Sequence, residues 1–470
     1  MYRQETISTT VEAASRAAEL QSQMQGQVIL EGDPQYDQAR QAWNLTVDQH
    51  PAMIMIAESA ADIVKAVRHA RQHALKIAVQ STGHGVALPA DGSMLIITSR
   101  LKEIRIDPEA QTAWVAAGVK WGEVLEKCGP FGLAPLLGSS PDVGVIGYTL
   151  GGGMGWLGRK YGLSADSVNF FELITPDGQL IQASSSENSD LFWGLRGGGG
   201  NFGVITGMEI RLYPVSQVYG GNLIYPIAAA REVYAHYRQW ISDAPDELTA
   251  SIVIMNIPPL PIFPEPLRGQ TVVMVRGCYC GSMEDGEALL DHWRSWKAPM
   301  IDDFKPMPFT QVATISNDPV DPMPGLSSSA WLKDLSDETV ETLLQYGAAQ
   351  NGPCPLTITE VRFAGGSISK ADPHTSAYGN REATLLLQTI GMASTPEILQ
   401  GLKGYVQEFK QALGSHLTGG VYINFLEGEE NQARSKDAYT PENYRRLQSL
   451  KAKYDPENIF CHGISIPPLP

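Results

Sequence analysis

The sequence predicts an α+β protein with two domains. The chain has 470 residues, which is more than one ordinary hydrophobic core accommodates. Glycine is frequent before residue 216, whereas over residues 216–417 it becomes rarer and proline rises. In that second region strand-like runs alternate with helix-like runs, which is typical of an α+β domain.

The first region opens with a predicted helical lead-in over residues 1–47. Residues 52–57 predict a buried strand, and residues 59–75 predict a helix capped by Ser59 with apolar residues at helical spacing. A second strand over 76–81 completes a compact β-α-β unit. The loop that follows, Ser-Thr-Gly-His-Gly, carries a histidine at its tip.

The rest of this region predicts hairpins over 104–118 and 169–184, the latter with an Asp177-Gly178 turn, and a helix over 120–129. Near the end of the chain, residues 419–428 alternate and predict a strand. On such a strand Tyr422 and Asn424 share one face. An ordinary half-buried strand would produce the same alternation.

Composition narrows the classes of function. The net charge is −16 and no cluster of Lys and Arg stands out, which argues against a nucleic-acid surface. No apolar run approaches the roughly 18 residues of a membrane helix. The first 23 residues contain no signal-peptide core, so we expect a cytoplasmic protein.

The five cysteines predict reduced thiols and no metal centre. Only Cys278 and Cys280 are close, on one face of a probable strand, and no further cysteine or histidine pair completes a zinc set. Packing in the core is the favoured interpretation for both. An odd, scattered set of cysteines also fits a reducing compartment.

Two glycine runs are candidates for a nucleotide site. Nine of the 28 residues in 138–165 are glycine, and a second run covers 197–200. Such runs let backbone approach a ligand and present N–H groups to phosphate. Both contain G-x-G-x-x-G, but neither match opens an amphipathic helix, so a Rossmann site is rejected and another nucleotide-binding fold is expected. By itself, His84 fits a solvent-facing loop residue as well as a ligand contact.

Five segments in order resemble the berberine-bridge-enzyme type of FAD-linked oxidases, in the vanillyl-alcohol-oxidase superfamily with its PCMH-type FAD fold. They are residues 79–85, 138–168, 191–206, 421–425 and 443–460. The resemblance implies a two-part FAD domain over 48–215 and 418–470, with an inserted substrate domain over 216–417. That inserted domain would be an antiparallel sheet flanked by helices.

The resemblance also implies the residues of the site. His84 would attach covalently to the flavin 8α-methyl group. Ser140 stands where many members have a second, cysteine tether, so one bond is expected. The FAD contacts would be Gln80, Ser81, Thr82, Gly83, Gly85, Gly138, Ser139, Ser140, Val143, Gly144, Gly147, Tyr148, Gly151, Gly152, Gly203, Val204, Ile205, Tyr422 and Asn424.

The function expected from this resemblance is an FAD-dependent oxidase. A C–H next to an alcohol or amine of a small molecule would give hydride to the flavin, and O2 would become hydrogen peroxide. Tyr422 is the expected base, with Asn424 beside it and Gln388 as the partner that activates it; Glu360 is a weaker candidate. Val143 resembles the valine that goes with oxygen reactivity in related plant enzymes. The alternatives are a dehydrogenase, an amine oxidase of the 6-hydroxynicotine oxidase type, and a flavin-binding protein without turnover.

Overall fold

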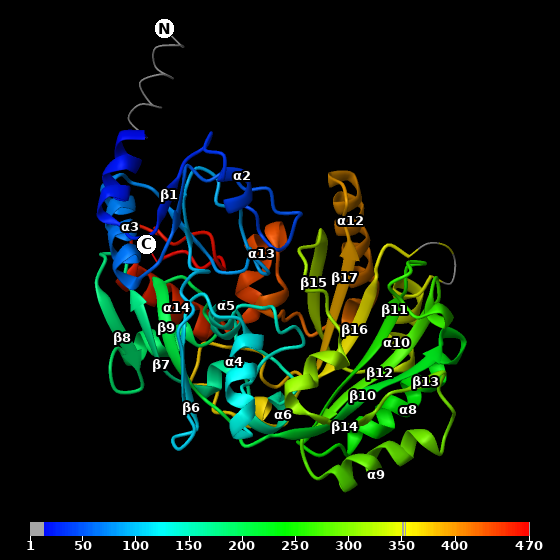
Figure 1. Cartoon of the computed structure of the whole chain (residues 1–470). Coiled ribbons are helices and arrows are strands. Elements are labelled where there is room, and N and C mark those ends of the chain that lie inside the picture. Colours follow the sequence, from blue (N-terminus) through cyan, green and yellow to red (C-terminus); the bar gives the residue numbers. More distant parts are fainter. Residues whose placement is uncertain (1–13, 350–351, 353, 470) are drawn as a thin grey trace.

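The computed structural model describes residues 14–349, 352 and 354–469, and contains three sheets. Two smaller sheets lie on one side of the molecule and one large sheet lies on the other (Figure 1). The α+β fold class is confirmed. None of the helices in the described part of the chain is both long and apolar enough to cross a membrane.

The first sheet contains the predicted β-α-β unit. Its order is β1 (Gln27–Ile29), β2 (Met53–Ile56), β4 (Met94–Ile97) and β3 (Ile77–Gln80). Strand β4 lies between β2 and β3 and pairs parallel with both. The crossover helix α3 (Ala60–Gln72) begins at Ser59, whose side chain accepts from the Asp62 N–H, and its apolar residues are buried as predicted.

The second sheet is antiparallel and holds both predicted hairpins. Its order is β5 (Ile104–Asp107), β6 (Thr112–Ala116), β9 (Val204–Arg211), β7 (Val168–Ile174) and β8 (Leu180–Ser184). The β7–β8 turn places Gly178 at φ +76°, a conformation that favours glycine. Helix α4 (Trp121–Cys128) buries its apolar face in the core of this sheet.

The third sheet is antiparallel throughout. Its order is β13 (Ile301–Asp302), β10 (Gln217–Pro226), β12 (Thr271–Tyr279), β11 (Leu248–Asn256), β16 (Ile358–Phe363), β17 (Leu385–Met392) and β15 (Gly325–Leu332), and β14 (Lys305–Pro308) also pairs with β10. The sequence did not indicate β10 and β15, because Gly220-Gly221 and Ser327–Ser329 lower their strand propensity.

The two faces of this sheet differ in chemistry. Alternate residues such as Ile252, Val275 and Leu387 join a core with the helices α8 (Ala230–Ser242), α9 (Met283–Arg294), α10 (Asp337–Gly347) and α12 (Pro396–Leu413). The opposite face carries buried polar side chains, among them Arg276 and Glu360. This arrangement matches the antiparallel sheet with flanking helices that was predicted for the inserted region.

The last part of the chain packs against the first two sheets. Helix α14 (Pro441–Tyr454) lies over α7 (Ser189–Leu195), and its fully buried Lys451 donates to the Asn201 carbonyl and pairs with Asp455 at 2.7 Å. The remaining helices are short: α2 (Tyr36–Ala39), α5 (Val145–Leu150), α6 (Gly158–Tyr161), α11 (Ser367–Lys370) and α13 (Gly428–Arg434). The Thr440 cap that the sequence predicts for α14 is present.

Two local predictions are wrong or incomplete. Residues 419–428 form no strand, because a 3-10 turn over Ile423–Phe425 interrupts the backbone after the extended Tyr422. The lead-in over 1–47 is helical only at 14–23 and in α2, and it also includes β1; residues 1–13 lie outside the described residues.

Candidate flavin site

The histidine loop lies against a segment that is about 60 residues further along the chain. A Cβ on Gly144 would be 3.4 Å from Ser81 Oγ and 3.6 Å from Thr82 Cγ2. Gly83 has φ +80°, and a Cβ there would be 2.8 Å from the backbone of Ala42 and Trp43, so this position requires glycine. The loop and the glycine-rich segment therefore form one contiguous surface.

Two contacts fix the His84 side chain, one at its ring face and one at its Nε2 atom. Its ring stacks on Trp43 at 4.1 Å between centroids, and its Nε2 lies 3.3 Å from Asp142 Oδ2. The other oxygen of Asp142 pairs with Lys120 Nζ at 2.5 Å. Burial lowers the pKa of His84, and the Asp142 carboxylate opposes that shift. The imidazole is therefore neutral at neutral pH, which is the form that can act as a nucleophile.

The glycine-rich segment combines tight contacts with open positions. A Cβ on Gly151 would lie 1.8 Å from Asn424 Oδ1, and one on Gly152, at φ +102°, would lie 2.6 Å from the Tyr378 ring. Side chains from the C-terminal region therefore rest directly on this backbone. By contrast, a Cβ on Gly85 or Gly147 would meet nothing within 4 Å. These two positions leave room for a ligand beside the backbone.

Tyr422 is the tyrosine whose hydroxyl receives hydrogen bonds in this site. The backbone N–H of Met154 and the Asn424 Nδ2 each donate to its hydroxyl at 3.0 Å. Burial raises the pKa of Tyr422 above its ordinary value, and these two donors and the charge of Arg362 oppose part of that rise. For the neighbouring Tyr148 and Tyr378, burial raises the pKa well above the ordinary value. Asn424 also donates to the Tyr148 carbonyl at 3.0 Å, which fixes its amide.

The polar face of the large sheet supplies charged groups near Tyr422. Glu360 lies 3.0 Å from Arg362 Nε and 3.9 Å from Arg276 Nη1, and these cations help to lower its pKa despite burial. The Arg362 guanidinium lies 5.2 Å from the centre of the Phe425 ring, which in turn contacts the Tyr422 ring edge-on. Glu360 is thus an ion-paired carboxylate, and Arg362 is the charge that faces Tyr422.

Gln388 does not make the predicted pairing with Tyr422 in this structure. Its Nε2 donates to Ser327 Oγ at 3.3 Å, and its Oε1 is buried without a partner. It lies on the polar face of the sheet, directly across from Glu360 in the β16–β17 register. The activating contacts of Tyr422 come instead from Met154 and Asn424.

The remaining predicted FAD contacts fall into two groups. Gly138 packs against the Tyr148 ring, Ser139 and Ser140 follow it, and the Val143 carbonyl accepts from Trp121 N–H. Ser140 Oγ accepts from the Asp142 N–H at 3.3 Å, so it lies next to the partner of His84. Gln80 instead forms hydrogen bonds with the Gln41 carbonyl and the Gln49 side chain. Gly203 directly precedes β9, and the side chains of Val204 and Ile205, the first two residues of β9, lie in hydrophobic cores. For both groups, contact with FAD stays a prediction.

Several site residues were not found from the sequence. Trp43, Asp142, Lys120, Met154 and Arg362 come from four separate parts of the chain. Asp142 and Met154 lie inside the glycine-rich segment 138–165, and Asp142 is the acidic residue of that pair. Trp43, Lys120 and Arg362 are brought to the site only by the tertiary fold.

The described residues suit a large nucleotide cofactor and give no metal centre. The hydroxyls of Ser81 and Tyr148 are buried without a partner; the first faces Gly144, and the second faces Gly138 and Gly155. Among the described residues, no cluster of His, Cys, Asp and Glu could hold a metal ion. Cys278 and Cys280 are buried in a hydrophobic core, as predicted.

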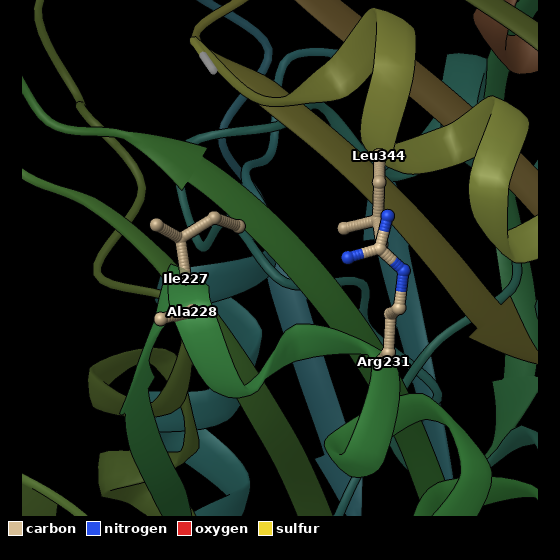
Figure 2. Close-up of a pocket in the computed structure, with 4 residues that line it drawn as sticks. All are labelled: Ile227, Ala228, Arg231 and Leu344. Atoms are coloured by element: carbon tan, nitrogen blue, oxygen red, sulfur yellow. The ribbon is translucent and has the colours of Figure 1, made fainter.

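A separate hollow lies elsewhere and lacks such chemistry. It measures about 350 Å³ and is lined by Ile227, Ala228, Arg231 and Leu344, on the helix-covered side of the large sheet (Figure 2). Its one charged residue, Arg231, is mostly exposed and pairs with Glu341. The flavin site therefore remains the candidate active site.

Comparison with known proteins gives the identity of this site. Residues 51–184 match the family model "FAD binding domain", and residues 421–467 match "Berberine and berberine like". The first match includes the histidine loop and the whole glycine-rich segment 138–165, and the second includes Tyr422 and Asn424. The chain is an FAD-dependent oxidoreductase. It combines an FAD-binding domain with a berberine-like C-terminal segment, and its relatives include FAD-linked oxidoreductases of the berberine-bridge-enzyme-like type.

Individual relatives cover nearly the whole chain. An FAD-linked oxidoreductase of Bacillus subtilis is 28% identical over 95% of this chain and 98% of its own length. The (R)-6-hydroxynicotine oxidase of Paenarthrobacter nicotinovorans is 27% identical over 95% of this chain and 97% of its own length. The chitooligosaccharide oxidase of Gibberella zeae is 25% identical over 93% of this chain and 92% of its own length. The solved 6-hydroxy-D-nicotine oxidase of Arthrobacter nicotinovorans superposes with a TM-score of 0.82 at 24% identity, over 94% of this chain and 98% of that one.

Proposed function

We propose that this chain is an oxidase that removes hydride from a C–H next to a hydroxyl group of a small molecule, and that its electrons pass to O2 to give hydrogen peroxide. The observation that carries the proposal is the environment of Tyr422. Its hydroxyl receives two hydrogen bonds at 3.0 Å and faces the charge of Arg362. These contacts favour the phenolate, the form able to accept a proton from a substrate.

Each group around Tyr422 has a defined role in this reaction. Tyr422 takes the hydroxyl proton as the C–H bond breaks. The Met154 N–H and Asn424 amide hold the phenolic oxygen in place, and Asn424 is itself fixed by the Tyr148 carbonyl. Because a free tyrosine has a pKa of about 10, Tyr422 depends on these neighbours near neutral pH.

The cofactor site supports the other half of the reaction. FAD supplies the hydride acceptor when it is bound. The residues placed to hold it are Ser81, Thr82 and His84 with the facing Gly144, and the open positions at Gly85 and Gly147. The neutral imidazole of His84 supports a covalent tether at this residue. Ser140 cannot supply a second one, since a serine hydroxyl is a poor nucleophile at neutral pH.

Oxygen as the acceptor is proposed from Val143. Its side chain is half-buried at the edge of the core, and its carbonyl is fixed by Trp121 N–H. A valine leaves more space there than the leucine that blocks oxygen in related plant enzymes. We therefore favour an oxidase over a dehydrogenase that uses another acceptor.

A polar, hydroxyl-bearing substrate fits the face of the large sheet near Tyr422. Arg276, Glu360, Arg362 and Gln388 all lie on that face, and the Gln388 Oε1 is an acceptor without a partner. The named relatives include a chitooligosaccharide oxidase, which supports a sugar-like alcohol, and a 6-hydroxynicotine oxidase, which supports an amine.

One screen tests the proposal. The holoenzyme is mixed with sugars, secondary alcohols and cyclic amines, and both hydrogen peroxide and anaerobic bleaching of the flavin are recorded. Peroxide from a sugar or other alcohol supports the proposal. Bleaching without peroxide would establish the dehydrogenase alternative, turnover of amines alone would establish an amine oxidase, and no bleaching by any compound would contradict the assigned substrate class.

A further inference from the structure

We propose that Asp142 is the positioning residue for covalent flavin attachment: it orients the His84 ring through Nε2 and accepts the proton that leaves this nitrogen when Nδ1 forms the bond to the flavin. The inference rests on the proposed tether at His84. It adds a role for a residue that neither the relatives nor the sequence patterns assign.

The geometry places the carboxylate where such a role requires it. Asp142 Oδ2 lies 3.3 Å from Nε2, and stacking on Trp43 with an angle of 21° between the ring planes fixes the ring. The hydrogen bond engages Nε2, so Nδ1 is the nitrogen that can form the new bond. The side chains of His84 and Asp142 are only 15% and 17% exposed, which limits the competition from water.

The aspartate is itself held in position. Its second oxygen pairs with Lys120 at 2.5 Å, and its backbone N–H donates to Ser140 Oγ at 3.3 Å. Ser140, at the position of the family's second tether, thus supports the loop that carries Asp142. The Lys120 ion pair therefore fixes the position of the carboxylate beside His84.

The Nδ1–C bond to the flavin 8α carbon forms, and one C–H bond of that methyl group breaks. One proton leaves from the methyl group and one leaves from Nε2, the latter to Asp142. The two electrons reduce the flavin, and O2, the acceptor in the proposed oxidase reaction, takes them up as hydrogen peroxide. Because the imidazole gains positive charge when Nδ1 is alkylated, an adjacent carboxylate stabilises the transition state.

The test follows attachment rather than turnover. Protein from flavin-limited cells is mixed with FAD, and the flavin that remains with acid-precipitated protein is measured against time, with the linked peptide located by mass. We expect Asp142→Asn to bind FAD but to slow attachment by about 10²-fold, the lower end for a positioned proton acceptor. The matched control is Glu126→Gln, an exposed acidic residue of the same helix α4, and it should match the wild type.

The pH profile separates a chemical role from a structural one. Attachment requires neutral His84, so its rate falls as pH drops through the pKa of His84. Asp142 raises that pKa and Lys120 lowers it. In Asp142→Asn the acidic limb should therefore move to lower pH while the plateau falls. A lower plateau with an unmoved limb would overturn the proposal.

A second variant covers the case in which Asp142→Asn takes up no FAD. Lys120→Met keeps the carboxylate and removes its other partner, so attachment should stay at least as fast and its acidic limb should move to higher pH. Attachment in Lys120→Met that is as slow as predicted for Asp142→Asn would overturn the proposal. Equal rates in the wild type and Asp142→Asn would overturn it while leaving the tether intact, whereas wild-type flavin released by acid would contradict the tether itself.

Discussion

The Asn424 amide donates to the Tyr422 hydroxyl at 3.0 Å, although the two residues do not lie on a strand. The sequence indicated that they share one face, and the structure brings them together through a 3-10 turn at Ile423–Phe425. The same turn places the Asn424 side chain on the Gly151 backbone. This contact joins the C-terminal segment to the glycine-rich segment.

Replacement of Tyr422 by Phe removes the proposed base and keeps the ring. Flavin reduction by substrate should slow by about 10²–10⁴-fold, the range for positioned proton transfer. Stopped-flow absorbance under anaerobic conditions measures this rate. Tyr439→Phe is the matched control, since Tyr439 is also buried and its hydroxyl bonds to the Gly197 carbonyl away from Tyr422. A rate in Tyr422→Phe within threefold of wild type would rule out the role.

Replacement of Arg362 by Gln should change the pH dependence of the same step. Arg362 lowers the pKa of Tyr422, so its loss raises that pKa. The rate increases with pH as the phenolate forms, and in Arg362→Gln this rise should move to higher pH. Arg238→Gln, which removes a cation from a pair with Asp337 at the surface, should leave the profile unchanged. A profile that stays fixed in Arg362→Gln would show that this charge does not act on the base.

The Val143→Leu substitution tests the path of oxygen. The larger side chain should slow reoxidation of the reduced flavin by air and leave reduction by substrate within about threefold of wild type. Double-mixing stopped-flow separates the two half-reactions. If wild-type reduced flavin takes minutes to reoxidise, the oxidase proposal gives way to the dehydrogenase alternative.

Glu427 makes stability depend on pH in a direction that can be checked. Burial raises its pKa to about 8, and the groups that face it are the Ser327 N–H and Asn44 Nδ2 at 3.4 Å and the charge of Glu430. Above the ordinary pKa of a glutamate the unfolded chain releases this proton, whereas the folded protein keeps it up to about pH 8. The free energy of unfolding therefore falls as pH rises from the ordinary glutamate pKa to about 8.

The Glu427→Gln variant removes this proton linkage. The difference in Tm between the variant and the wild type should grow in favour of the variant between pH 5 and about 9, as differential scanning calorimetry would show. Glu429→Gln, an exposed neighbour, is the control and should give a constant difference. A constant difference for Glu427→Gln would show that its carboxyl has an ordinary pKa.

Regular elements with strong local signals were predictable from the sequence. The Ser59 cap and the spacing of Ile63 and Val67 defined α3, and the Asp177-Gly178 turn defined a hairpin. Strands β10 and β15 were not found because glycine and serine occupy positions where cross-strand packing, not local propensity, stabilises the strand.

The site was predictable only where its residues occur in continuous motifs. His84 and the glycine-rich segment could be found in this way. Trp43 and Arg362 could not, because each reaches the site by long-range packing, and the same holds for the contact between Met154 and Tyr422. The Gln388 pairing depended on the register of β17 against β15 and β16. Sequence spacing carries no information on such contacts.

The most direct measurement is to locate the flavin on the chain. Purified wild-type protein is precipitated with acid, digested, and searched by mass spectrometry for peptides that carry FAD. The account predicts that the yellow colour stays with the protein and that one peptide, containing His84, carries the flavin. His84→Ala should release all of its flavin into the supernatant. Flavin released from the wild type, or linked to a cysteine such as Cys128 or Cys461, would contradict the account.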